Sequence, residues 1–252
     1  MSHSLLKLEL SKNSEIEFFP GHLVHNGEKV LYSDVDGVAY QYTTTQHRVN
    51  FVPVGKSHKF YVSIKALGKK HTITFSGSHN TEVYGKLANA VDVLIKPFVS
   101  VTLLLEFAKE NKLEIAELTI TPAGIYKKRT WRGPELLPWN QYYNSLIHKG
   151  HVQILKADEK KKYILFASPF MASTNAVVLP DVLNFLFSKQ CILDEATRNQ
   201  IIAKKMELVA ISAHDVAQVS KALDACPMCG EKPEEGGQKF CGKCGSPLLA
   251  TV

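Results

Sequence analysis

Two cysteine pairs near the end of the chain restrict its folding more than any other sequence feature. Cys226 and Cys229 form one Cys-x-x-Cys pair, eleven residues follow, and Cys241 and Cys244 form the second pair. Each pair can turn tightly around one metal ion and place two thiolates at adjacent corners of a tetrahedron. Four thiolates leave no open position for water, so the spacing predicts one structural Zn2+ ion. Redox-active cysteine pairs and an iron centre are the alternatives.

The segment between the two pairs is short and polar, so the metal must supply its folding free energy. The knuckles Cys-Pro-Met-Cys-Gly and Phe-Cys-Gly-Lys-Cys-Gly-Ser-Pro-Leu resemble those of the zinc-ribbon family. The resemblance implies a zinc ribbon, which we expect over residues 224–252. Acidic and basic residues are balanced there, which argues against strong phosphate binding and favours protein docking or a purely structural role.

The overall charge and the cysteine usage bound the class of protein. Lys and Arg number 30 against 24 Asp and Glu, a net charge of +6 that allows an anionic partner without requiring one. Four of the five cysteines stand in metal spacing, which suits a reducing compartment. The first residues lack the pattern of a signal peptide, and no apolar run is long enough for a transmembrane helix. We therefore expect a cytoplasmic protein.

Residues 13–112 show a series of strand patterns followed by a helical one. Turn signals lie at Pro20-Gly21 and Asn26-Gly27, and Gly68-Lys69-Lys70 indicates a hairpin. From Glu82 onward apolar residues recur at helical intervals, which predicts a helix from about residue 79 to 110 that bends at Pro97. The expected strands cover residues 16–19, 22–25, 30–34, 38–42, 48–54, 59–64 and 72–75.

Residues 113–190 repeat this order in shortened form and end in a short helix expected over 179–187. Pro122-Ala-Gly124 stands in the place of Pro20-Gly21, and Leu137-Pro138-Trp139 stands in the place of Leu31-Tyr32-Ser33. Short antiparallel strands closed by one C-terminal helix form a small barrel or sandwich.

Both segments resemble pleckstrin-homology-like domains arranged in tandem, as in bacterial proteins. The resemblance implies an α+β fold of two antiparallel small barrels, each closed by a C-terminal helix. Residues 191–223 then form a helical linker, in which Asp194-Glu195 caps a helix that runs to about Ile211.

Two groups of basic residues are candidate anion-binding sites. They can bind an anionic lipid or a nucleic acid, or they can simply form solvated hairpin tips. Aromatic residues interleave with the first group and can stack on bases or lie at a membrane interface, unless Trp139 and one tyrosine belong to the core. The basic residues are Lys127, Lys128, Arg129, Arg132, Lys160, Lys161 and Lys162, and the aromatic ones are Trp131, Trp139, Tyr142 and Tyr143.

No catalytic signature occurs in the chain. Walker, dinucleotide-binding, HExxH and Gly-x-Ser-x-Gly motifs are all missing from the sequence. Cys191 is expected to be a small buried residue rather than a nucleophile, and His22 and His25 are poorly spaced for a second metal. We therefore expect a non-enzymatic adaptor that binds other proteins through the pleckstrin-homology-like domains and the zinc ribbon. The alternative is polyanion binding by the basic loops of residues 113–190.

Overall fold

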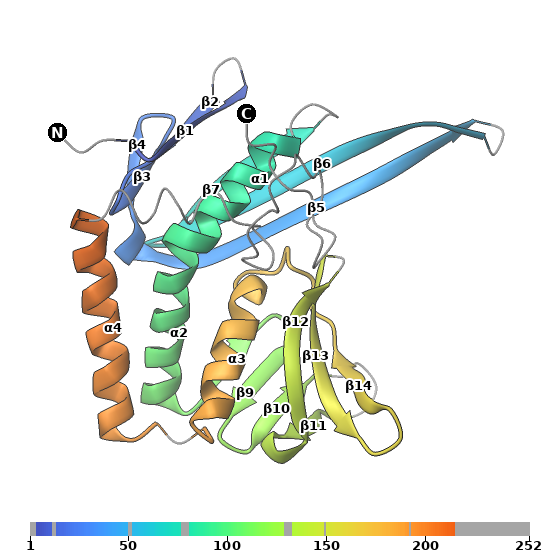
Figure 1. Ribbon diagram of the computed structural model, residues 1–252, viewed down its shortest axis with the longest axis vertical. Coiled ribbons are helices and arrows are strands. Elements are labelled where there is room, and N and C mark those ends of the chain that lie inside the picture. The colour runs from blue at the N-terminus through green and yellow to red at the C-terminus, as the bar shows by residue number, and fades with distance from the viewer. Residues whose placement is uncertain are drawn as a thin grey trace, which may run out of the picture. The chain divides into compact units, whose positions relative to one another are not determined.

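The computed structural model describes residues 4–11, 14–49, 52–76, 81–128, 133–148, 150–191 and 193–214 (Figure 1). Within these residues the fold is α+β, as the sequence predicted, with four antiparallel sheets and several helices. The chain divides into two compact units. Unit 1 holds most of the first 98 residues, and unit 2 holds residues 99–207 together with Gly37–Ala39.

Unit 1 contains two sheets whose strands follow one another in chain order. The four-stranded sheet consists of β1 (Leu6–Ser11), β2 (Ser14–Phe18), β3 (His22–His25) and β4 (Glu28–Leu31). A 3-10 turn, η1 (Tyr32–Asp34), leads into the three-stranded sheet of β5 (Val35–Val49), β6 (Val52–Ala66) and β7 (Lys69–Ser76). Val62 and Ile64 of β6 are fully buried, and Ser63 between them is also buried, so both faces of the strand are covered there, whereas Lys65 is exposed.

A long helical segment follows the second sheet. It comprises α1 (Thr81–Ala90), a π-helical turn η2 (Val91–Ile95) and α2 (Lys96–Glu110). In the π turn the Lys96 N–H donates to the Val91 carbonyl, five residues back. This turn directly precedes Pro97, which has no N–H to donate and disturbs the regular hydrogen-bond ladder. The sequence predicted a bend at Pro97, and the structure has a π turn that ends two residues before this proline; α1 contacts both β1 and β6.

Unit 2 repeats the same order of elements. Its four-stranded sheet consists of β8 (Leu113–Ile115), β9 (Leu118–Thr121), β10 (Gly124–Lys127) and β11 (Glu135–Pro138). The 3-10 turn η3 (Trp139–Gln141) leads into β12 (Tyr142–His148), β13 (His151–Asp158) and β14 (Lys162–Ala167). A short η4 (Ala176–Val178) precedes α3 (Leu179–Ser188), which packs on β12.

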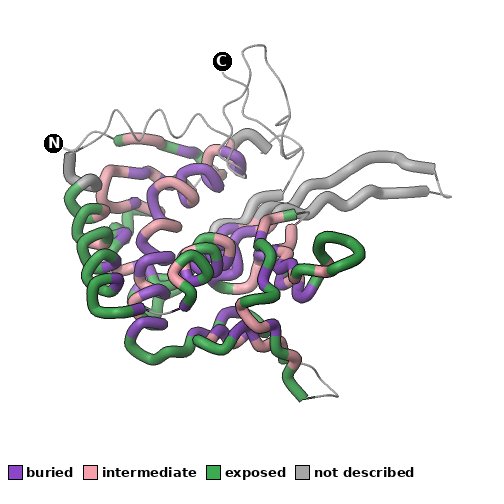
Figure 2. The backbone as a smooth tube through the Cα atoms, turned by 60° about the horizontal axis from the view of Figure 1, so that its bottom comes forward, coloured by how far each residue is buried: buried purple, intermediate pink, exposed green. Residues whose placement is uncertain are grey.

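The helix α4 (Glu195–His214) begins at the predicted cap. The Asp194 carboxylate accepts the Thr197 N–H at 2.8 Å, and hydrogen bonding to Thr197 lowers the pKa of Asp194. Figure 2 shows that most of α4 is exposed, with only Thr197 and Ile201 buried along its described part. No helix in the described ranges is long and apolar enough to span a membrane.

One side-chain interaction occurs at the same place in both repeats. The 3-10 turns η1 and η3 each begin with an aromatic residue, Tyr32 and Trp139. The Tyr32 hydroxyl donates to the Phe19 carbonyl at 2.8 Å, and the Trp139 indole N–H donates to the Thr121 carbonyl at 2.9 Å. Each acceptor immediately precedes the proline of its turn. The structure therefore matches Tyr32 with Trp139, one position away from the sequence alignment of Leu31-Tyr32-Ser33 with Leu137-Pro138-Trp139.

The strand assignments from the sequence were wrong in three places. Residues 32–34, expected to end a strand, form the 3-10 turn η1. The expected strands 38–42 and 48–54 are parts of two 15-residue strands, β5 and β6, because β-branched threonines continue β5 where a break was expected. Strand β1 was not expected, although Leu6, Leu8 and Leu10 alternate with charged residues. In the described part of the chain no sheet closes into a barrel, and each sheet keeps two edge strands.

Candidate functional site

The predicted zinc ligands Cys226, Cys229, Cys241 and Cys244 lie outside the described residues, as do Arg129 and Arg132. Among the described residues, no group of three or more His, Cys, Asp and Glu side chains is arranged to hold a metal ion. His22 and His25 have different surroundings: His22 stacks on Phe19 at 4.6 Å, while His25 meets the edge of His71.

Of the described lysines in the candidate anion-binding groups, Lys127 ends strand β10 and the exposed Lys128 follows it, whereas Lys160 to Lys162 lie where β14 begins. The Lys127 ammonium lies 3.5 Å from the Phe166 carbonyl, in the second half of β14. Lys160 and Lys161 form the turn before β14, where the Asp158 carboxylate accepts both backbone N–H groups at 3.0 and 2.9 Å. The two lysine groups are therefore separated by most of the length of the strand, about 13 Å.

An exposed aromatic surface lies between them. The rings of Tyr143 and Tyr163 stack with centroids 5.3 Å apart and an interplanar angle of 18°. The Lys162 ammonium lies 5.7 Å from the centre of the Tyr143 ring, and hydrogen bonding to Tyr143 raises the pKa of Lys162. Leu165, two residues after Tyr163 on the same strand face, is 52% exposed. We call Tyr143, Tyr163 and Leu165 the docking face.

Sequence reasoning found only part of this surface. Tyr142 is buried and joins β12 to α3, since its hydroxyl lies 2.7 Å from both Ser145 and Asn184. Burial raises the pKa of Tyr142 to about 12. Trp139 is only half-buried, and its indole N–H donates to the Thr121 carbonyl. The expectation of a core residue is therefore confirmed for Tyr142 but not for Trp139. The sequence signal that was missed is the alternation of Tyr163 and Leu165, which places both side chains on the same face of a strand.

Unit 1 has a cavity between the ends of two hairpins. Asn26-Gly27 closes the β3–β4 hairpin and Leu67-Gly68 closes the β6–β7 hairpin. The cavity has a volume of about 570 Å3. It is lined by Glu28, Lys29, Val30, Leu31, Asp34, Ala66, Leu67, Lys69 and His71.

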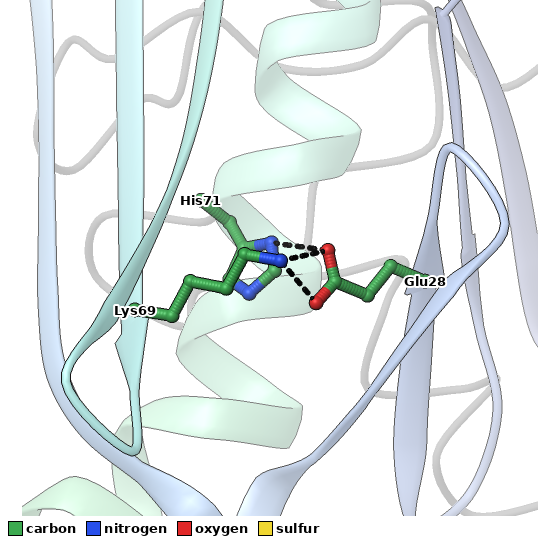
Figure 3. A network of polar contacts seen from close by, with 3 residues as sticks. All are labelled: Glu28, Lys69 and His71. Carbon is green, nitrogen blue, oxygen red and sulfur yellow. Dashed lines mark hydrogen bonds and ion pairs between the residues drawn. The ribbon is translucent and has the colours of Figure 1, made fainter.

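Three charged or titratable side chains line one side of this cavity (Figure 3). The Lys69 ammonium donates to both oxygens of the Glu28 carboxylate, which lowers the pKa of Glu28. The buried His71 places Nδ1 4.0 Å from the same carboxylate. The Glu28–Lys69 pair is substantially exposed, so water and salt screen its attraction. The network links the two sheets of unit 1 and holds no nucleophile.

The remaining candidate nucleophile is inert. The Cys191 thiol is buried and donates weakly to the Leu186 carbonyl at 3.4 Å. Burial raises the pKa of Cys191 to about 12, so almost no thiolate forms near neutral pH. The expectation that Cys191 is a buried packing residue is confirmed. No known family model and no curated protein matches this chain.

Proposed function

We propose that each repeat is a pleckstrin-homology-like domain and that residues 224–252 form a zinc ribbon. Support for the domains comes from their shared plan: a four-stranded meander, a 3-10 turn that begins with an aromatic residue, a three-stranded meander and a following helix. The matching Tyr32 and Trp139 hydrogen bonds add a side-chain detail to that plan. The zinc ribbon rests on the cysteine spacing alone.

The proposed function is that of a non-enzymatic adaptor, and the docking face is its protein-binding surface. Tyr143, Tyr163 and Leu165 are 37%, 46% and 52% exposed, so the face presents two aromatic rings and an aliphatic side chain to solvent. Clustered exposed apolar side chains mark interaction sites, and tyrosine is enriched in protein interfaces. The stacked rings are held in place before binding, which reduces the entropy lost on association.

The surroundings of the docking face indicate the chemistry of the partner. Lys160, Lys161 and Lys162 lie at the turn that begins β14, and their side chains are exposed. A partner segment that places an apolar side chain on Leu165 and an acidic residue beside this turn matches both features. We therefore expect a protein partner with an apolar anchor and an adjacent acidic residue.

Affinity purification of the full-length protein from its native cells, with quantitative mass spectrometry, tests this function. The variant Tyr163→Ser/Leu165→Ser removes the apolar anchors. The matched control Ile202→Ser/Met206→Ser removes similarly exposed apolar residues from α4. We expect the wild type and the control to enrich the same partner, and the docking-face variant to lose it at least about tenfold. Equal recovery with both variants, or no partner with any form, would show the proposal to be wrong.

Polyanion binding by the basic loops of unit 2 is the second candidate. The observation in its favour is that β14 runs past both lysine groups, with Lys127 beside Phe166 and Lys160–162 at the opposite end. Replacing the three lysines of the turn by glutamine should then weaken binding to DNA or to anionic vesicles. Unchanged binding to both would exclude these lysines as the polyanion site.

A further inference from the structure

The cavity of unit 1 lies along an unpaired strand edge. Strand β4 is the last strand of its sheet, and among the described strands it pairs only with β3. All of β4, Glu28–Leu31, lines the cavity. Successive side chains of a strand point to opposite faces, so a cavity lined by four residues in a row must follow the edge between the two faces. The backbone of β4 therefore borders the cavity.

The register of the β3–β4 hairpin identifies the backbone groups on this edge. The Tyr32 N–H donates to the Gly21 carbonyl at 3.2 Å, and bonded and non-bonded residue pairs alternate along an antiparallel ladder. The pairs that contain Lys29 and Leu31 are therefore the non-bonded ones. Both N–H groups and the Lys29 carbonyl point away from β3, and none of the three has a hydrogen-bond partner among the described residues. These three groups are available to an added strand.

The matching edge of unit 2 is blocked by a proline. Leu31 immediately precedes η1 and has φ of −75°, and Pro138 immediately precedes η3 and has φ of −63°. Proline has no N–H to donate, and prolines on edge strands protect sheets from pairing with other chains. Unit 1 has instead a leucine that is 42% exposed. The edge of β4 therefore remains open where its counterpart is closed.

A second exposed leucine lines the cavity from the β6–β7 hairpin. Leu67 is 81% exposed and adopts φ of +49°. Glycine or asparagine would adopt this φ at lower cost in the two-residue turn. The Leu67 N–H donates to the Asp34 carbonyl at 3.3 Å, which holds the hairpin tip beside η1. A strained, exposed leucine beside a cavity indicates a surface that contacts a ligand.

The charges around the cavity indicate what this ligand carries. Figure 3 shows Glu28 of β4 reaching Lys69 and His71 of β7, so the Lys69 ammonium is already paired within the protein. Lys29 is exposed, and no described residue forms an ion pair with it. A carboxylate directly opposite Lys29 on an added strand would form a favourable cross-strand pair. An acidic residue therefore complements the free lysine of the cavity.

We propose that the cavity binds an extended peptide segment of another protein, which adds to β4 as a fifth, antiparallel strand. The residue opposite Lys29 is acidic and exchanges both backbone hydrogen bonds with it. The residue opposite Leu31 is apolar and contacts the exposed side chains of Leu31 and Leu67. The residue between them is small, because Val30 beneath it is buried.

The peptide pattern is therefore apolar–small–acidic in chain order, because the added strand runs antiparallel to β4. The cavity volume of about 570 Å3 lies within the usual range of binding sites. This site is independent of the docking face, which lies in unit 2. A small anion bound by Lys29 is the competing occupant, and it would need no backbone hydrogen bonds.

The test begins with selection from a phage-displayed library of random peptides of about seven residues, a common strand length, with full-length protein as bait. Enriched peptides should show the apolar–small–acidic pattern, and their affinities are then measured by fluorescence anisotropy. The variant Leu31→Pro removes one free N–H without breaking the native ladder, because φ of −75° suits proline. Its affinity should be at least about tenfold lower than that of the wild type.

Two further variants separate ligand contact from structural effects. Leu67→Asn should lower the affinity at least about fivefold while raising the urea midpoint, because asparagine adopts positive φ more readily than leucine. A purely structural residue would not change binding and stability in opposite directions. The matched control Leu165→Asn removes an exposed leucine from unit 2, and its affinity should stay within about twofold of wild type.

N-methylated peptides test strand addition with the wild-type protein alone, so they decide the proposal even if Leu31→Pro fails to fold. Methylation of the acidic residue removes the N–H that donates to the Lys29 carbonyl and should lower the affinity at least about tenfold. Methylation of the small residue, whose N–H points away from β4, should have an effect below about threefold.

Three results would overturn the proposal. The library could yield no enriched peptide. The two methylated peptides could bind alike, and displacement of the peptide by inorganic phosphate would then mean that the cavity takes an anion rather than a strand. Loss of affinity with Leu165→Asn but not with Leu67→Asn would place the peptide on the docking face instead.

Discussion

Asn175 provides a quantitative test of how the structure holds unit 2 together. It is 8% exposed and adopts a left-handed conformation, with φ of 64°. Its side-chain oxygen accepts the Val38 N–H at 2.9 Å, and its own N–H donates to the Val38 carbonyl at 2.7 Å. Asparagine is one of the few residues other than glycine that adopts this φ at low cost. Asn175 therefore contributes in two ways: its side chain accepts the Val38 N–H, and its backbone adopts the left-handed conformation at low cost.

The two contributions can be separated by two substitutions. Asn175→Ala leaves the buried Val38 N–H without its acceptor, which costs about 1–3 kcal/mol. Alanine in the left-handed region costs about 1–2 kcal/mol more, so the free energy of unfolding should fall by about 2–5 kcal/mol. Asn175→Gly loses the same hydrogen bond but adopts the positive φ freely, at an entropic cost below about 1 kcal/mol. The glycine variant should therefore be more stable than the alanine variant by about 1 kcal/mol.

Thermal and urea unfolding followed by circular dichroism measure these differences. For a protein of this size the alanine variant should melt about 5–15 °C below the wild type. Asn111→Ala is the control, because Asn111 also has a positive φ of 54° but lies exposed directly after α2, and it should lose only the conformational contribution. The reasoning would be refuted if Asn175→Ala cost no more than Asn111→Ala, or if Asn175→Gly were the less stable variant.

Four further outcomes are expected. In native protein a thiol reagent should leave Cys191 unlabelled, because burial raises its pKa to about 12. A zinc chelator should make four thiols reactive, and the fifth thiol, that of Cys191, should react only after unfolding. Labelling of Cys191 before unfolding would contradict its burial. Cys226→Ser should abolish zinc binding, measured by metal analysis, while residues 13–190 stay folded, and global unfolding would mean that the zinc module is part of the main core. Gly124→Ala should destabilise the protein by at least about 2 kcal/mol in urea, since φ is +148° and a Cβ would lie 2.3 Å from the Leu137 carbonyl oxygen; a neutral effect would exclude this turn geometry. Burial and the charge of His71 lower the pKa of His25, so the unfolded state binds this proton at a higher pH than the folded state does. The free energy of unfolding should therefore fall as the pH drops below about 6.5. His25→Gln should reduce this pH dependence of the urea midpoint, and an unchanged pH profile would argue against the role of His25.

Local signals predicted most of the element order but not how far the strands extend. The α4 cap, the hairpin after Leu67 and the helical break near Pro97 all follow from single residues and their immediate neighbours. The single 15-residue strand β5 could not be foreseen, because strand length depends on a hydrogen-bonded partner such as β6 that local patterning does not reveal.

The residues of the candidate sites were likewise predicted only where local sequence was sufficient. The basic and aromatic residues of unit 2 were identified from their types, but the partnership of Tyr143 with Tyr163 depends on the register of three strands. The bulge between Tyr142 and Asn144 in the β12–β13 pairing shifts that register, and a single-residue shift exchanges the buried and exposed faces. Exposure of Tyr143 beside the buried Tyr142 therefore required the folded sheet.

The sequence by itself determined the α+β class, the repeated order of turns and helices, and a cysteine spacing that predicts one structural zinc ion. These features depend on residues close together in the chain, through turn geometry, capping and metal-ligand spacing. Only the tertiary structure brought Asn175 to Val38, Tyr32 to Phe19 and the residues of the docking face together. Those arrangements depend on pairings between distant residues, whose free energy is gained only when burial and hydrogen bonding outweigh the entropy of closing the intervening chain.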